Sequence, residues 1–503
     1  MKNSLVNYIW VVVLLTGAFF VKADDDNTAK PVPDAFQIVS DHKGKFGGKS
    51  VSYQAIVGNS LLKRGDGTVY AEAVTTSYIA GSAGPLRPVT FVFNGGPGSA
   101  STWLHMGLMG PKRVRVPSDA GDAGLAPYKI DDNPLALLDI TDLVFIDPIG
   151  TGFSRLAGDG KAEDVYGLEE DARSVAQIVR EWVRANGRWN APKFIAGESF
   201  GTTRAAAMLP FLQGGPEPMR INAVIMISQA MDYTGSTPVH DNLVAHVTYL
   251  PSLAATARYH GKLQNRLDDL PAFMAEVRKF ALDEYLPALF KGSALSASEF
   301  NQIAAKLADY TGISEAYIKQ ANLRILTGRF AKELLRDSGE VVGRLDARYK
   351  ASDLDVVSEN ARFDAASSAI SGAYSSAFRH YMQHDLSVAL NRPYYGSGPD
   401  VNANWVYDRS EGYIEPSYVN TAPQLAQAMK LNPALKVMVA SGFYDLVTPF
   451  FDAEYTLARH GIDMDRVKMT YYEAGHMMYV YEDAFTRLSQ DMRVFMTESL
   501  AVK

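Results

Sequence analysis

The chain has 503 residues, 47% of them hydrophobic and 21% charged, and it contains no cysteine. Without thiols it cannot form a zinc ribbon, an iron–sulfur cluster, a cysteine protease or a disulfide-stapled domain. The formal net charge of −7 provides no general attraction to phosphate backbones, so no nucleic-acid partner is expected. The apolar fraction is that of a globular protein, and the length is sufficient for a large buried core.

The first residues have the pattern of a secretory signal peptide. Lys2 precedes an apolar stretch from Tyr8 to Val21, and the small side chains of Val21 and Ala23 fit a cleavage site after Ala23. The stretch is shorter than the ~20 apolar residues of a membrane anchor, so no stable membrane insertion is expected after cleavage. We expect residues 1–23 to be removed and the protein to be secreted or periplasmic. The absence of cysteine and of Asn-x-Ser/Thr acceptors favours a bacterial enzyme over a eukaryotic glycoprotein.

Residues 24–236 contain two kinds of strand signal. From about residue 35 to residue 78, apolar and polar residues alternate between glycine-rich turns, which predicts antiparallel hairpins. Short apolar runs then alternate with helical segments; the runs lie at residues 89–93, 142–146, 193–196 and 223–228. Uninterrupted apolar strands with helices between them are typical of a parallel sheet that is covered on both faces.

The strand signal stops between residues 237 and 405, where helical spacing predicts an insertion or cap. The predicted helices lie at residues 263–286, 296–310 and 314–335, the second of them beginning with a capping box at Ser296 and Glu299. Apolar strands return at residues 435–440 and 467–472, and a helix at residues 484–497 closes the chain. The predicted architecture is an α/β core in two parts, residues 24–236 and 406–503, interrupted by a helical cap at 237–405.

The strongest chemical signal is Gly197-Glu198-Ser199-Phe200-Gly201. An apolar strand precedes it, and an alanine-rich helix follows from Thr202 to Leu212. In this strand–turn–helix context the two glycines permit a crowded turn that exposes the serine hydroxyl above the sheet. Ser199 is therefore the predicted nucleophile.

A serine hydroxyl is a weak nucleophile at neutral pH, so it needs a base and a group that orients the base. Asp445 comes soon after the predicted strand at residues 435–440, and His476 soon after the one at 467–472. In α/β-hydrolases the triad follows the order Ser, Asp, His, and open α/β sheets carry their sites at the carboxyl ends of strands. Ser199, Asp445 and His476 meet both conditions and are predicted as a catalytic triad.

Asn94-Gly95-Gly96-Pro97-Gly98 follows the predicted strand at residues 89–93. Because glycines leave backbone N–H groups accessible, the N–H groups of Gly96 and Phe200 are predicted to form an oxyanion hole. A phosphate cradle is excluded, because the run has neither the Lys-Ser/Thr of a P-loop nor a Gly-x-Gly-x-x-Gly frame.

These motifs resemble those of the serine carboxypeptidases, a branch of the α/β-hydrolases. The resemblance rests on six segments in order: Asn94–Ser101, Asp147–Ser154, Gly197–Gly201, Leu250–Lys262, Ser441–Pro449 and Gly475–Tyr479. It implies a mixed, mostly parallel sheet flanked by helices, with a helical cap inserted before the catalytic aspartate. Together with the exported, cysteine-free character of the chain, it implies a bacterial-type member of that family.

The resemblance also implies the role of each site residue. Ser199 would attack the carbonyl, His476 would act as base, and Asp445 would orient His476. Asn94 and Glu198 would hold the free α-carboxylate of a peptide substrate. A protonated carboxyl can donate a hydrogen bond to a carboxylate whereas an ionised one repels it, so acidic pH is expected to favour peptide cleavage.

The chain departs from the family pattern at three positions. Leu108 stands where relatives often carry a second glutamate, which leaves the strength of the acid preference open. Ser99 and Thr448 stand where relatives often carry cysteine, so the corresponding disulfides and thiol sensitivity are excluded.

No cofactor and no metal are expected. His380 and His384 have i, i+4 spacing on a predicted helix, but Tyr381 and not glutamate follows His380, so the zinc-protease pattern fails.

Two other classes of function remain open at this point. A proline-type aminopeptidase, an esterase or an acyltransferase on the same fold would share the triad and the glycine-rich segment. A hydrolase-fold binding protein without activity is disfavoured by the intact Ser, Asp and His. The sequence alone leaves open the residue preference around the cleaved bond, the oligomeric state and the physiological substrate.

Overall fold

A computed structural model of the chain describes residues 29–81, 84–263, 269–407 and 418–501. The predicted signal peptide, residues 1–23, lies outside these ranges. The main sheet has the strand order β1 (Gln37–Phe46), β2 (Lys49–Lys63), β3 (Val69–Ala80), β7 (Asp142–Ile146), β4 (Val89–Phe93), β9 (Lys193–Glu198), β10 (Ala223–Ile227), β13 (Lys436–Gly442) and β14 (Val467–Tyr472), and β8 (Arg155–Leu156) pairs with β3.

The sheet combines an antiparallel edge with a parallel centre. β1, β2 and β3 pair antiparallel, as the alternating sequence predicts, and β3 pairs antiparallel with β7. From β7 through β4, β9, β10 and β13 to β14 every neighbouring pair is parallel. This mixed, mostly parallel order with flanking helices is the α/β-hydrolase fold, and it confirms the predicted fold class.

Helices cover both faces of the sheet, which is why its central strands are buried and mostly apolar. All five residues of β4 and of β10 are buried. One core cluster joins the sheet to α2 (Leu168–Ala185), α3 (Phe200–Gln213) and α12 (Ala422–Leu431). The cluster on the other face includes α10 (Ala365–His380) and α14 (Glu482–Leu500).

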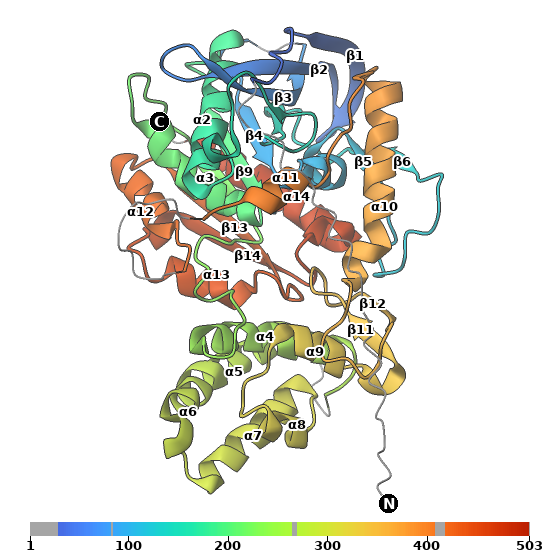
Figure 1. Ribbon diagram of the computed structural model, residues 1–503, viewed down its shortest axis with the longest axis vertical. Coiled ribbons are helices and arrows are strands. Elements are labelled where there is room, and N and C mark those ends of the chain that lie inside the picture. Colours follow the sequence, from blue (N-terminus) through green and yellow to red (C-terminus); the bar gives the residue numbers. More distant parts are fainter. Residues whose placement is uncertain (1–28, 82–83, 264–268, 408–417, 502–503) are drawn as a thin grey trace, which may run out of the picture.

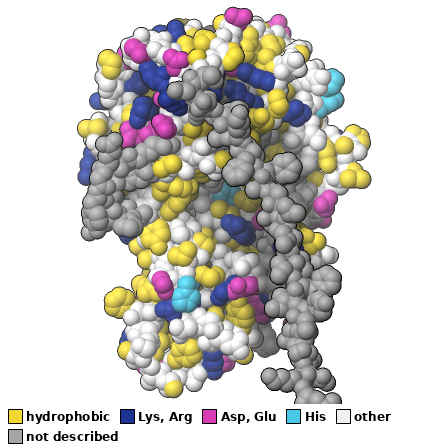
Figure 2. Space-filling model, viewed as in Figure 1, with side chains coloured by type: hydrophobic (Ala, Val, Ile, Leu, Met, Phe, Trp, Pro, Cys, Tyr) yellow, Lys and Arg dark blue, Asp and Glu magenta, His cyan; other side chains and the backbone are white. Residues whose placement is uncertain are grey.

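A third core cluster belongs to a helical lobe that lies below the sheet in Figure 1. The lobe consists of α4 (Leu243–Tyr259), α5 (Leu270–Phe280), α6 (Leu286–Lys291), α7 (Ala297–Thr311), α8 (Glu315–Gln320) and α9 (Thr327–Glu333). The space-filling view shows a broad upper and a narrower lower body, with basic and acidic side chains on both (Figure 2).

Short elements connect these parts. They are α1 (Thr102–Leu104), β5 (Lys112–Val114), β6 (Ile130–Asp132), β11 (Glu340–Val342), β12 (Lys350–Ser352), α11 (Pro399–Asn404) and α13 (Phe450–Leu457). Within the described ranges no helix is both long and apolar enough to span a lipid bilayer.

The segment predicted as one helical insertion, residues 237–405, is divided by its packing. α4 to α9 share the core of the lobe, whereas α10 packs against the sheet beside α14, and Val401 of α11 joins the cluster on the opposite face. β11 and β12 also lie in this segment; at three residues each they are too short to give a periodic signal. The domain boundaries themselves stay predictions.

Two helical predictions have different outcomes. The capping box at Ser296 is confirmed, because its hydroxyl accepts from the Glu299 N–H and the Glu299 carboxylate accepts from the Ser296 N–H. The single helix predicted at residues 314–335 is wrong, because the chain forms α8 and α9 with a break between them. At the break Asn322 and Leu323 have φ values of 50° and 64°, a conformation that ends a right-handed helix.

Candidate active site

Ser199 lies at the sharp turn between β9 and α3. Its φ of 60° and ψ of −130° are strained for a residue with a side chain. The turn is also crowded: a Cβ added to Gly197 would lie 2.4 Å from the carbonyl oxygen of Gly201. The glycines of the Gly-x-Ser-x-Gly motif are therefore required by the close approach of the backbone, as a nucleophile elbow demands.

Asp445 and His476 lie beyond the carboxyl ends of β13 and β14, and their side chains are hydrogen-bonded. His476 Nδ1 and Asp445 Oδ2 are 2.8 Å apart, and both residues are buried. Burial, the largest single effect, lowers the pKa of His476, but the Asp445 carboxylate beside it and, to a smaller extent, Glu198 and Asp364 raise the pKa, so that the net shift is upward. Since Nδ1 faces Asp445, Nε2 is the nitrogen left for a reacting hydroxyl.

The cavity at the carboxyl edge of the sheet has a volume of about 370 Å³, and both Ser199 and His476 line it. No hydrogen bond joins the Ser199 hydroxyl to His476 in the part of the chain that the structure describes. Hydrogen bonds between catalytic groups are often long in structures without substrate and tighten when it binds. The structure thus brings the predicted triad residues Ser199, Asp445 and His476 to one site.

The predicted oxyanion residues lie next to the elbow. Gly96 lines the cavity with a φ of 106°, in the region that favours glycine. A Cβ on Gly95 would lie only 2.4 Å from the backbone nitrogen of Phe200, so the glycine-rich segment and the start of α3 are in close contact. This contact brings the backbones that carry the Gly96 and Phe200 N–H groups together beside Ser199.

Asn94 and Glu198 form a buried pair on the same cavity. Asn94 Nδ2 donates to Glu198 Oε1 at 2.9 Å, and Asn94 Oδ1 accepts from the Leu104 N–H at 3.0 Å. The two residues are 1% and 3% exposed, and both line the cavity with Ser199. The bond from Leu104 fixes the orientation of the Asn94 amide, so that its N–H donors face Glu198.

Burial raises the pKa of Glu198 to about 7, because the ionised form is poorly solvated there. His476, then hydrogen bonding by Tyr479 and by Asn94, act in the opposite direction and offset part of the rise, while the Asp445 carboxylate adds to it. At mildly acidic pH Glu198 is therefore protonated and can donate a hydrogen bond to a carboxylate.

Tyr479 lies beside Glu198, and only its place at the end of the Gly475–Tyr479 segment marked it in the sequence. Its ring packs on Gly107, where an added Cβ would lie 2.4 Å from the ring. The Tyr479 hydroxyl and Glu198 Oε2 are both buried and make no fully formed hydrogen bond among the described residues, but the hydroxyl lies close enough to favour the ionised form of Glu198. Burial and then the proximity of Glu198 raise the pKa of Tyr479 well above its usual value, so the phenol is neutral.

Thr448, which the sequence marked only as a missing cysteine, supports the Asp445–His476 pair. Its hydroxyl donates to Asp445 Oδ2 at 2.7 Å and lies 3.2 Å from His476 Nδ1. The N–H groups of Val447 and Thr448 donate to Asp445 Oδ1 at 2.8 and 2.9 Å. Asp445 thus has both oxygens fixed in position while one of them faces the imidazole.

Arg204 is fully buried under the glycine-rich segment. Its guanidinium pairs with Asp171 of α2 at 2.6 Å and donates to the backbone oxygen of Asn94 at 2.6 Å. Arg204 therefore positions the backbone of Asn94 from beneath the cavity.

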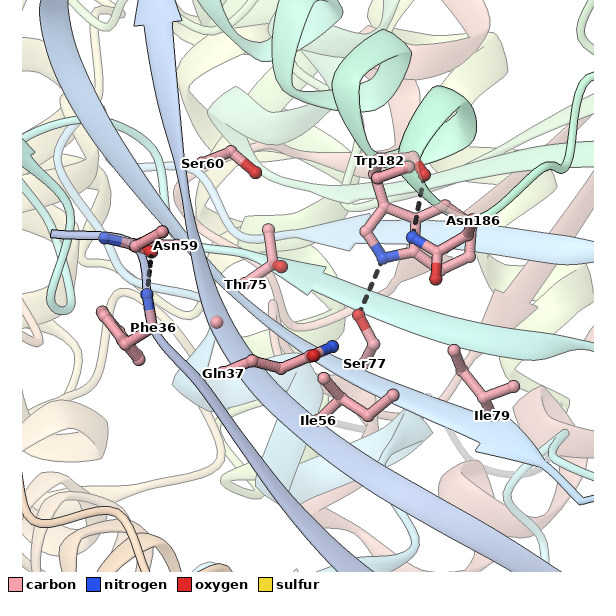
Figure 3. Close-up of a pocket in the computed structure, with 13 residues that line it drawn as sticks. Phe36, Gln37, Ile56, Asn59, Ser60, Thr75, Ser77, Ile79, Trp182 and Asn186 are labelled. Carbon is pink, nitrogen blue, oxygen red and sulfur yellow. Dashed lines mark hydrogen bonds between the residues drawn. The ribbon is translucent and has the colours of Figure 1, made fainter.

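Neither of two other features adds to this site. The rings of His380 and His384 lie 4.4 Å apart, and the described residues contain no group of three side chains that could hold a metal. A separate cavity of about 320 Å³ lies among β1, β2, β3 and α2 (Figure 3). Some of its polar groups bond to one another, as Trp182 Nε1 does to the Ser77 hydroxyl at 2.9 Å, and no predicted site residue lines it.

A protein-family model matches residues 80–209 of the chain. The family is serine carboxypeptidase. The matched stretch contains Asn94, Gly96, Glu198 and Ser199, whereas Asp445 and His476 lie outside it. Comparison with curated proteins gives no match.

Several solved structures are similar to the chain at low identity. They include the thioesterase domain from the curacin biosynthetic pathway, a highly thermostable carboxyl esterase from Bacillus coagulans, and a lipase in its open form. Their identities are 11%, 11% and 12%, and their TM-scores 0.33, 0.34 and 0.32. Each alignment covers 88% of this chain, and 99%, 98% and 98% of the other chain, respectively.

Proposed function

We propose that the whole chain is a serine carboxypeptidase that releases C-terminal residues from peptides through an acyl-enzyme. The observation that carries this proposal is the Asn94–Glu198 pair, which lines the same cavity as Ser199 and His476. A nucleophile and base alone would fit any serine hydrolase. A neutral carboxyl with an amide donor beside them is suited to a substrate that ends in a free carboxylate.

The proposed reaction has two halves. Ser199 Oγ attacks the carbonyl carbon while His476 Nε2 takes its proton, and Asp445 holds the imidazole through Nδ1. The N–H groups of Gly96 and Phe200 stabilise the oxyanion. His476 then gives the proton to the leaving amine, and water hydrolyses the ester with His476 again as base.

Substrate binding in this proposal depends on the proton of Glu198. Below a pKa of about 7 Glu198 is neutral and donates to the terminal carboxylate together with Asn94. Above that pKa two negative charges would face each other. Leu108, in the position of the second glutamate of many relatives, is buried and apolar, so no further carboxyl at that position joins the pair.

The test compares peptide substrates that differ in whether their two ends are free or blocked, together with a simple ester. N-blocked dipeptides with a free C-terminus are expected to be cleaved, whereas their C-terminal amides and unblocked aminoacyl amides are expected to be poor substrates. Preference for the unblocked substrate would instead identify an aminopeptidase, and equal cleavage of a simple ester would identify an esterase. An added acyl acceptor separates hydrolysis from acyl transfer through the partitioning of products.

Export is a separate part of the proposal and rests on the sequence of residues 1–23. Cleavage after Ala23 would release the enzyme into the periplasm or the medium of a bacterial cell, where peptides are its partners. Amino-terminal sequencing of the protein recovered from those compartments tests this. A protein that keeps Met1 and stays with the cytoplasm would contradict it.

A further inference from the structure

A second cavity adjoins the active-site cavity. It has a volume of about 510 Å³ and is lined by residues of the helical lobe and of the segment before α10. Arg344 and Asp364 line both cavities, so the two share a wall. The rest of its lining includes apolar side chains, among them Leu326, Val342 and Phe363.

The charged side chains that line the second cavity differ in whether other groups of the protein already bind them. Both oxygens of Asp364 are occupied: Oδ2 accepts from the N–H groups of Arg344 and Leu345, and Oδ1 accepts from the N–H of Ser367 at the start of α10. Arg362, which also lines the second cavity, pairs with Asp355 at 3.2 Å.

The Arg344 guanidinium, in contrast, can bind a ligand. Arg344 is exposed, and among the described residues its side chain makes no hydrogen bond and no ion pair, although its backbone is bonded to Asp364 and Leu446. An arginine is always charged, and its planar group presents several donors that match a carboxylate. The wall between the cavities thus presents the unused donors of Arg344 to a bound group, whereas the oxygens of Asp364 on the same wall are engaged by backbone N–H groups.

The position of the second cavity indicates which part of a substrate reaches it. Asn94 and Glu198, proposed to hold the terminal carboxylate, line only the first cavity. The residues of a peptide upstream of the cleaved bond must leave Ser199 in a direction away from that pair. The second cavity lies past Arg344 and shares none of the residues Asn94, Gly95, Gly96 or Glu198.

We infer that the second cavity receives the upstream residues of the substrate and that Arg344 selects peptides with an acidic side chain there. This inference rests on the proposed carboxypeptidase function. The chemical class of the preferred substrate is a peptide that carries a glutamate or aspartate before its last residue. Since Arg344 is exposed, the preference is expected to weaken with salt.

The experiment compares N-blocked peptides that differ only by Glu, Gln or Lys at one of three positions upstream of the cleaved bond. They are assayed at about pH 6, where a side-chain carboxylate is ionised and Glu198 keeps its proton. The quantity measured is the ratio of kcat/KM for Glu over Gln. In the wild type we expect this ratio to be about tenfold or more at one of the positions, as for a charge-assisted hydrogen bond.

Arg344→Gln is expected to bring the ratio close to one, and Arg344→Glu to favour Lys over Gln. Arg220→Gln is the matched control. Arg220 is likewise an exposed arginine, but it lies before the amino end of β10, whereas the site lies at the carboxyl ends of the strands, and it lines neither cavity. It is expected to keep the wild-type ratio.

A wild-type ratio near one at all three positions would overturn the inference, as would a ratio that Arg344→Gln leaves unchanged. The salt dependence of the wild-type ratio gives a second reading that needs no variant: an acid preference that is the same at 0.05 and about 0.5 M salt would exclude an exposed arginine as its source. Failure to cleave any free-carboxylate peptide would contradict the proposed function itself, whereas cleavage without acid preference contradicts only this inference.

Discussion

The Asn94–Glu198 pair and Arg344 line the same cavity but differ in how far water reaches them. The pair is almost fully buried, and burial raises the pKa of Glu198 to about 7. Arg344 is exposed and keeps a full charge. In the proposed function the two regions would recognise a carboxylate in different ways: a neutral buried donor, whose action depends on pH, and an exposed cation, whose action depends on salt.

The largest effect is expected from loss of the nucleophile, because cleavage of the substrate is the reaction through which both regions are measured. Ser199→Ala is expected to lower kcat/KM for an N-blocked dipeptide about 10⁴-fold or more, since the nucleophile is lost. Release of the C-terminal amino acid measures this. The thermal unfolding midpoint serves as control for folding, and undiminished release would eliminate Ser199 as the nucleophile.

Glu198→Gln tests whether the buried region acts through a proton. In the wild type kcat/KM is expected to decline on the alkaline side of its optimum, because Glu198 has a pKa of about 7 and its protonated fraction falls about tenfold between pH 6 and pH 8. Gln donates at any pH, so the variant is expected to lose this alkaline decline and to keep the acid-side decline that His476 causes. An alkaline decline that persists in the variant would assign it to another group.

Glu198→Gln can also be tested without substrate, through the pH dependence of the free energy of unfolding. The pKa of Glu198 is about 7 in the folded protein and about 4 in an unfolded chain, so the folded state binds the proton more tightly. Its contribution to stability is therefore complete at about pH 4 and is lost as the pH rises through about 7. Relative to Glu198→Gln, the wild type is expected to lose up to about 3 kcal/mol of unfolding free energy over that interval. Parallel pH profiles of the two proteins in urea titrations would contradict the shifted pKa.

Thr448→Val removes the hydroxyl that holds Asp445 while preserving the shape of the side chain. The loss of one hydrogen bond to a carboxylate predicts a fall in kcat of about tenfold, with little change in KM. Thr311→Val is the control, because the Thr311 hydroxyl is also buried but bonds to Leu307 within the helical lobe. Equal effects of the two variants would indicate general destabilisation and not a role in the site.

Tyr479→Phe gives the smallest expected effect. The Tyr479 hydroxyl favours the ionised form of Glu198, so its removal is expected to move the alkaline limb of kcat/KM to higher pH by roughly half a unit. Tyr285→Phe, whose hydroxyl bonds to Leu323 in the helical lobe, is the control. A shift to lower pH would show that Tyr479 does not act on the carboxylate.

Much of this arrangement follows from local sequence. Mostly apolar runs specify the central strands, and Gly197 is required by a backbone contact with Gly201 only four residues away, so both can be read from the chain. The order of Ser199, Asp445 and His476 along the chain also indicates the topology of the fold, because α/β-hydrolases carry their triad in this order.

The residues that the sequence did not reveal act across distant segments. Tyr479 reaches Glu198, and Arg344 reaches the cavity from the end of the helical segment; neither has a spacing or composition that sets it apart. Similarly, the break between α8 and α9 occurs at Asn322 and Leu323, which both have positive φ. Leucine rarely adopts this conformation, so the sequence does not predict a break there. Such features depend on tertiary packing, which a single sequence does not display.

The burial of Arg204 limits which amino-acid substitutions the protein can tolerate near the site. Asp171, Arg204 and Asn94 form one chain of contacts from α2 to the cavity, and loss of either charge would leave the other buried without a partner. Substitution there is expected to damage folding before it can alter substrate choice. Arg344 has no such partners among the described residues, so substitution of Arg344 is expected to alter substrate preference without damage to folding, and residues around Asn94 are expected to tolerate less change.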